Sequence, residues 1–107
     1  MRLKAGVSPA GLTPQLLLGL LIAEGVYRRA GWDLRVTSLA DGEHAGRPVR
    51  GDDQDPHYVG KAADLGIKEI PEAQWPGLVD SLKLALGAEF VVLLEKNHIH
   101  CQWGHIA

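Results

Sequence analysis

The stretch Glu89–Trp103, EFVVLLEKNHIHCQW, decides the fold that we expect for this chain. Its first half, Phe90–Leu94, is a continuous apolar run with the length of a buried strand. Lys96 and Asn97 suit a tight turn, and His98–Trp103 then alternates in polarity as a return strand does. The stretch therefore predicts an antiparallel β-hairpin.

Two helical segments are expected upstream of this hairpin. Thr13 followed by Pro14 is typical of a helix start, because it combines an N-cap residue with a proline in the first turn. Gly31 predicts the end of that helix near residue 30. A second helix is expected over residues 71–86, where leucines recur on one face, and Gly87 ends it.

Two short strands are expected between the helices. Residues 33–38 (DLRVTS) alternate in polarity, and residues 61–67 (KAADLGI) place Ala62 and Asp64 on one face. Residues 1–12 and 39–56 are rich in glycine and proline and are interpreted as irregular segments. The order of these elements predicts an α+β fold, with a small antiparallel sheet of about four strands and two helices packed on one face.

The composition indicates a single folded domain over residues 1–107 and argues against several functions. Apolar residues make up 46% of the chain and charged residues 22%, as in ordinary globular domains. The net charge of −2, without a basic stripe, argues against nucleic-acid binding. The longest apolar run, Leu16–Ala23, is too short to span a bilayer, and no signal peptide is visible. We therefore expect synthesis in the cytoplasm and no membrane partner.

The hairpin also carries the residues with the clearest chemistry. Residues two apart on a strand share a face, so His98 and His100 point one way and Cys101 points the other, as a small buried hydrophobe. Upstream, His57 and Asp64 stand seven residues apart. Two imidazoles and one carboxylate are the donors of a catalytic zinc site, although other first-row metals accept them too. Either pattern alone occurs by chance, and the two together predict a metal site.

At these residues the sequence resembles a family of zinc peptidases. Residues 57–65, HYVGKAADL, resemble the S-x-H-x-x-G-x-A-x-D motif of D-Ala-D-Ala-type peptidases, and residues 98–100, HIH, resemble their H-x-H motif. The group includes peptidoglycan endopeptidases, phage endolysins and the hedgehog signalling domain, whose second motif is similar to residues 95–101, EKNHIHC. The likeness extends over residues 13–104 and implies a hedgehog-like or peptidase-like version of the α+β fold.

The resemblance implies a role for each of these side chains. Zn²⁺ would be held by His57, Asp64 and His100, while His98 would line the site and hydrogen-bond the water or an oxyanion. Glu95 is the implied general base. It stands three residues before His98 and five before His100, so the register leaves open which of the two histidines is the third ligand.

Two further positions bear on activity. His44 matches a histidine that lines the hedgehog site, which implies a role in substrate binding or in support of the metal ligands. The carboxypeptidase pattern has an arginine soon after the strand at residues 35–38, to polarise the scissile carbonyl, but residues 39–41 read LAD here. Arg47 or Arg50 could take that role.

These patterns predict a zinc metallopeptidase that hydrolyses peptidoglycan peptides at a D-alanine-containing bond, as a carboxypeptidase or an endopeptidase. The substrate class, and a bacterial or phage protein acting on the cell wall, come from the resemblance alone. The alternative is a non-hydrolytic, metal-bound binding or structural module of the same fold, for example a phage or prophage structural protein. The missing arginine favours the alternative, and Glu95 favours the enzyme.

Overall fold

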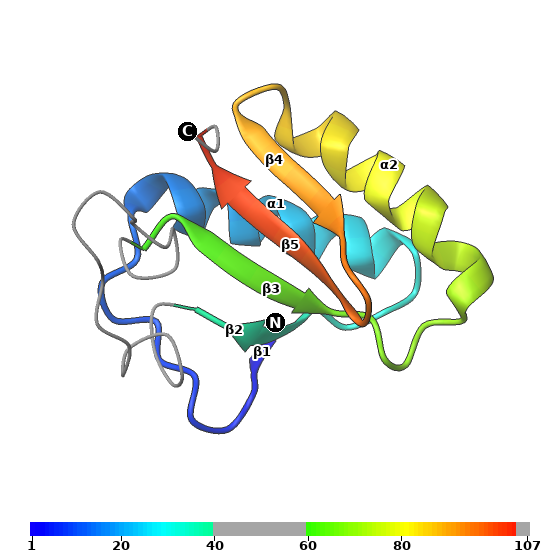
Figure 1. Ribbon diagram of the computed structural model, residues 1–107, viewed down its shortest axis with the longest axis horizontal. Helices are drawn as coiled ribbons and strands as arrows, with labels where there is room; N and C mark the ends of the chain where they lie inside the picture. The colour runs from blue at the N-terminus through cyan, green and yellow to red at the C-terminus, as the bar shows by residue number, and fades with distance from the viewer. Residues whose placement is uncertain (40–59, 105–107) are drawn as a thin grey trace.

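The computed structural model, which describes residues 1–39 and 60–104, contains two α-helices and one five-stranded sheet (Figure 1). Its elements in chain order are β1 (Arg2–Leu3), α1 (Pro14–Arg29), β2 (Arg35–Ser38), β3 (Ala62–Gly66), the 3₁₀ helix η1 (Glu72–Gln74), α2 (Trp75–Leu86), β4 (Phe90–Leu94) and β5 (His98–Trp103). The α+β class with two α-helices and the hairpin of β4 and β5 are confirmed.

The sheet differs from the expectation in one strand. Its order is β1-β2-β3-β5-β4, and β1 pairs with β2 in parallel whereas the other pairs are antiparallel. The expected antiparallel sheet of about four strands is thus a mixed sheet of five. β1 is only two exposed residues long, held by hydrogen bonds from the amides of Arg2 and Lys4 to the carbonyls of Leu34 and Val36. A strand so short has no periodicity that a sequence could show.

Helix α1 begins where the sequence predicts it. The Thr13 hydroxyl accepts a hydrogen bond from the Leu16 amide (3.2 Å) and donates one to the Gly60 carbonyl (3.0 Å), so it both caps the helix and ties its start to the segment before β3. Gly60 has a φ of +71°, and a Cβ added there would collide with the carbonyl oxygen of Gly11. No helix in the described parts of the chain is long and apolar enough to cross a membrane.

Both helices pack on the same face of the sheet, and in Figure 1 α1 crosses behind the strands while α2 runs beside β4. Leu65, Ile99 and Cys101 are fully buried in the core between the sheet and the helices, so the prediction of an inward-facing Cys101 is confirmed. Because strand residues alternate, their neighbours Asp64 and His100 lie on the other face. We call this face, turned away from α1 and α2, the site face.

Candidate metal-binding site

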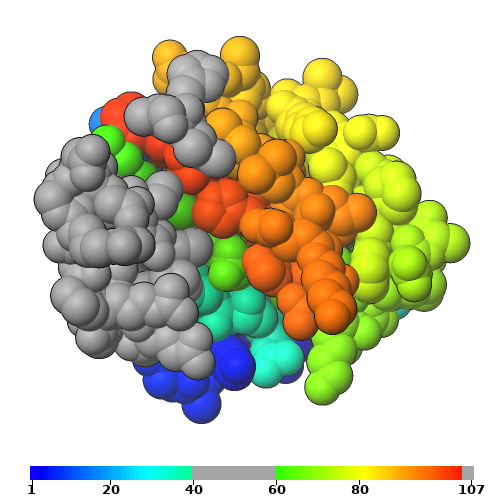
Figure 2. Space-filling model, viewed as in Figure 1, coloured from blue at the N-terminus to red at the C-terminus, as the bar shows by residue number. Residues whose placement is uncertain are grey.

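Strand pairing brings the predicted site residues of β3 and β5 together. Asp64 is the register partner of His100, and Gly66 is the partner of His98. On the other side of β3, an irregularity in the pairing places Ser38 opposite Asp64. Figure 2 shows β3, in green, reaching the surface of the site face between β2 and β5.

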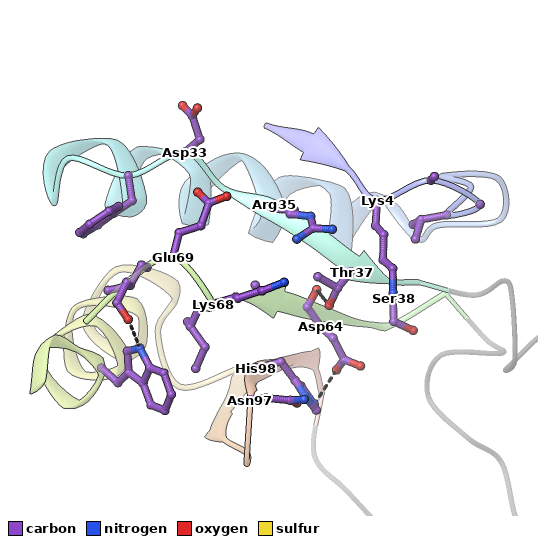
Figure 3. A pocket seen from close by; sticks show the side chains of 18 residues that line it. Lys4, Asp33, Arg35, Thr37, Ser38, Asp64, Lys68, Glu69, Asn97 and His98 are labelled. Atoms are coloured by element: carbon purple, nitrogen blue, oxygen red, sulfur yellow. Dashed lines mark hydrogen bonds and ion pairs between the residues drawn. The ribbon is translucent and has the colours of Figure 1, made fainter. Parts of the chain in front are cut away.

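The carboxylate of Asp64 contacts both histidines. Its Oδ1 atom lies 3.3 Å from Nδ1 of His100 and 3.5 Å from Nε2 of His98, and the second contact is drawn in Figure 3. The side chains are only 14% (Asp64), 12% (His100) and 29% (His98) exposed. Three of the residues predicted for the site are therefore adjacent in space and partly withdrawn from solvent.

His100 has a second partner that the sequence did not suggest. Its Nε2 atom lies 3.0 Å from Oε1 of Gln102, whose side chain is almost fully buried and whose amide nitrogen donates to the Gly104 carbonyl (3.4 Å). The hydrogen bond to Asp64 is the main cause that raises the pKa of His100, while partial burial opposes that rise. The alternation of β5 places Gln102 on the same face as His98 and His100, but its residue type alone indicates no role.

The spacing of these donors can be compared with that of metal ligands. Two atoms bound to one tetrahedral zinc at about 2.0–2.1 Å lie about 3.3 Å apart, close to both contacts of Asp64. The same distances also describe direct hydrogen bonds. Within residues 1–39 and 60–104, no group of three His, Cys, Asp or Glu side chains is arranged to hold one ion. The predicted ligand His57 lies outside the described residues, as do His44, Arg47 and Arg50.

Glu95, the predicted base, lies at the turn between β4 and β5. Its amide donates to the carbonyl of His98 (2.9 Å), which closes the turn, and its side chain is exposed. The carboxylate forms no hydrogen bond or ion pair with the described residues, but its negative charge helps to raise the pKa of His100. The carboxylate of Glu95 is thus near the histidines without a hydrogen bond or ion pair to them.

A groove of about 1090 Å³ is lined by Asp64 and His98 and by Trp32 and Trp75. Figure 3 shows Asp64 and His98 at one side of it and Asp33 and Glu69 at the other. Thr37 lies in its wall, and its hydroxyl donates to the backbone carbonyl of Asp64 (3.3 Å). A volume of this size accommodates a short peptide or a similar small molecule. The candidate site therefore has both a chemical centre and a space beside it for a ligand.

Comparisons with known proteins identify no relative. No family model matches the chain, and no curated protein or solved structure matches it either. The resemblance to zinc peptidases stays a prediction from the short motifs at residues 57–65 and 95–101, and a proposal of function rests on the residues of the site.

Proposed function

We propose that this protein is a zinc-dependent peptidase that hydrolyses peptidoglycan peptides at a D-alanine-containing bond. The observation that carries the proposal is the contact of one carboxylate, Asp64, with the imidazoles of His98 and His100 at the start of a groove. A carboxylate with two imidazoles is a donor set of catalytic zinc sites. The substrate class is taken from the likeness of residues 57–65 and 98–100 to the peptidase motifs.

In this proposal Asp64 and His100 hold the ion together with His57. The side-chain oxygen of Gln102 accepts a hydrogen bond from Nε2 of His100. Nδ1, which faces Asp64, is therefore the nitrogen available to a metal. When bound, zinc supplies Lewis-acid chemistry and activates water near neutral pH. The protein contributes a fixed carboxylate and an oriented imidazole, both partly shielded from solvent.

The remaining steps belong to side chains around these ligands. Glu95 accepts the proton of the attacking water, as its place before the H-x-H motif implies. His98 is held by a contact of 2.9 Å between its Nδ1 atom and Oδ1 of Asn97, so its Nε2 atom faces Asp64. Because the Asn97 oxygen accepts from Nδ1, Nε2 carries a proton only in the cationic imidazolium, and in that form it would donate a hydrogen bond to the oxyanion that forms on the scissile carbonyl.

Metal content and product analysis test this proposal together. After expression with zinc we expect about one zinc ion per chain, and His57→Ala should remove most of it and lower the melting temperature, since metal binding is linked to folding. Mass spectrometry of a muropeptide digest should then show cleavage next to D-alanine. Absence of any bound first-row metal in the purified protein would end the proposal.

One pair of observations favours the alternative, a metal-bound module that binds and does not hydrolyse. Where carboxypeptidases have an arginine this chain continues with Leu39, which is fully buried in the core and cannot polarise a carbonyl. The side chain of Glu95 is exposed and its carboxylate makes no hydrogen bond or ion pair with either histidine. Stoichiometric zinc without turnover of several wall peptides is the result that this alternative requires.

A further inference from the structure

A row of three residues crosses the site face from the histidines to an arginine. Val36 pairs with Leu65 and Gly66 pairs with His98, so the antiparallel register puts Arg35, Gly66 and His98 side by side on neighbouring strands. With strands about 4.8 Å apart, the Cα atoms of Arg35 and His98 are roughly 10 Å apart. Gly66 contributes no side chain, and Cγ2 of Thr37 and Cβ of Arg35 lie 3.4 and 3.5 Å from the position that a Cβ would take there.

Two lysines line the groove near the same arginine. Lys4 follows β1, Lys68 follows β3, and Figure 3 shows their side chains and that of Arg35 around Thr37, on the side of the groove that leads to Asp64. None of these three cationic side chains forms a hydrogen bond or an ion pair with the residues that the structure describes. Three positive charges thus border one part of the groove without a partner there.

Among the residues that the structure describes, the acidic side chains of the groove do not neutralise this cluster. Asp64 is engaged by the two histidines, and Glu69 lies 3.9 Å from Arg2 in an exposed ion pair. Asp33 is exposed and lies at the far end of the groove in Figure 3, together with Glu69. The part of the groove between Thr37 and Asp64 therefore favours a negatively charged group of a ligand.

We infer that Arg35, with Lys4 and Lys68, binds a carboxylate of the substrate. The guanidinium matches a carboxylate in a bidentate geometry, and the lysines add charge. An extended peptide advances about 3.3–3.6 Å per residue, so a Cα separation of roughly 10 Å places this carboxylate at most about three residues from the bond at His98, and closer where the arginine side chain reaches toward it. The inference rests on the proposed function and adds a substrate feature: an acidic group close to the scissile bond.

The carboxylate can come from the C-terminus of a peptide or from an acidic residue within it. Three peptides that end in D-Ala-D-Ala separate these sources: one with a free C-terminus and no other acid, one with an amidated C-terminus and an internal D-glutamate, and one that is amidated and neutral. Dissociation constants are measured by calorimetry at 4 °C on the purified protein with its bound metal, and mass spectrometry checks that the peptides stay intact.

We expect one of the acidic peptides to bind at least about tenfold more tightly than the neutral one. Arg35→Gln and Lys68→Gln should each remove most of that preference and leave binding of the neutral peptide unchanged. Arg29→Gln, at the exposed end of α1 and outside the groove, is the matched control and should keep the preference. Because Lys68 is exposed, its variant should fold even where Arg35→Gln does not.

Equal binding of all three peptides, no binding of any, or an equal loss in Arg29→Gln would overturn the inference. None of these measurements needs turnover. If the protein hydrolyses wall peptides but binds acidic and neutral peptides equally well, this inference fails and the proposed function stands. If the purified protein holds no zinc but still binds the acidic peptide more tightly, the proposed peptidase activity fails and the carboxylate-binding site stands.

Discussion

The Nε2 atom of His100 lies 3.0 Å from the side-chain oxygen of Gln102, which is 3% exposed. Because an amide oxygen only accepts hydrogen bonds, this contact keeps a proton on Nε2 and turns Nδ1 toward Asp64, 3.3 Å away. Metal-binding histidines are commonly oriented in this way by a hydrogen bond from their other nitrogen. In the proposed zinc site, Gln102 would therefore select which nitrogen of His100 serves as the ligand.

The first prediction concerns this amide. Gln102→Met keeps the size of the side chain but removes the acceptor, and it should weaken zinc binding about 10–100-fold. Gln102→Glu retains an acceptor and should stay within a few-fold of the wild type. Competition with a chelating dye measures the affinity, and ¹⁵N NMR of the imidazoles reports the tautomer of His100 without metal. Equal affinities in Gln102→Met and Gln102→Glu would leave Gln102 with a packing role only.

Local sequence patterns were sufficient for much of the fold. The helix start at Thr13 and the alternation of β5 depend on neighbouring residues, so they are visible in the sequence and the structure agrees with them. Strand β1 was missed because a two-residue strand is held by its partner's backbone and not by its own side chains. Neighbouring residues cannot reveal a pairing of that kind.

The candidate site shows the same limit. The sequence placed His98 and His100 on one face, and the structure adds that Asp64 lies opposite His100. The hydrogen bond between His100 and Gln102 depends on side-chain geometry. Strand pairing groups three cations from separate segments, namely Lys4, Arg35 and Lys68. Neither follows from spacing along the chain. The contribution of His57 remains a prediction of the motif.

The second prediction separates the two histidines. His100→Ala should lose bound zinc, because its Nδ1 atom is the one presented toward Asp64, whereas His98→Ala should retain zinc and lose activity. Elemental analysis of both purified variants, with hydrolysis of a D-alanine-containing muropeptide, makes the comparison. The reverse pattern, with zinc lost only in His98→Ala, would make His98 the third ligand.

The third prediction concerns Glu95. A general base contributes about 10²–10⁴-fold to a rate, so Glu95→Gln should lower kcat by that factor while zinc content and fold are retained. The amide has nearly the same size, and the exposed side chain makes no hydrogen bond or ion pair within the described residues, so loss of stability should not confuse the result. Unchanged turnover would move the base to another residue, with His98 or His44 next to be tested.

The fourth prediction uses the only cysteine of the chain. Burial raises the pKa of Cys101 from 9.0 to about 12. The thiolate is the reactive form, so at pH 8 its fraction in the folded protein should be on the order of a thousandfold below that of an ordinary thiol. Iodoacetamide should therefore label the native protein very slowly and the urea-unfolded protein readily, as followed by mass spectrometry. Fast labelling of the native protein would contradict a core position for Cys101.

The last prediction tests the connection between α1 and the segment before β3. Gly60 has a positive φ, its carbonyl accepts hydrogen bonds from both the amide and the hydroxyl of Thr13, and an added Cβ would collide with the Gly11 carbonyl. Gly60→Ala should therefore cost about 1–3 kcal/mol in the free energy of unfolding, measured with urea. Gly25→Ala is the control, since a Cβ meets nothing within 4 Å on α1, and alanine should stabilise the helix by about 0.5–1 kcal/mol. Equal stability of the two variants would show that residue 60 does not need the backbone conformation that only glycine adopts readily.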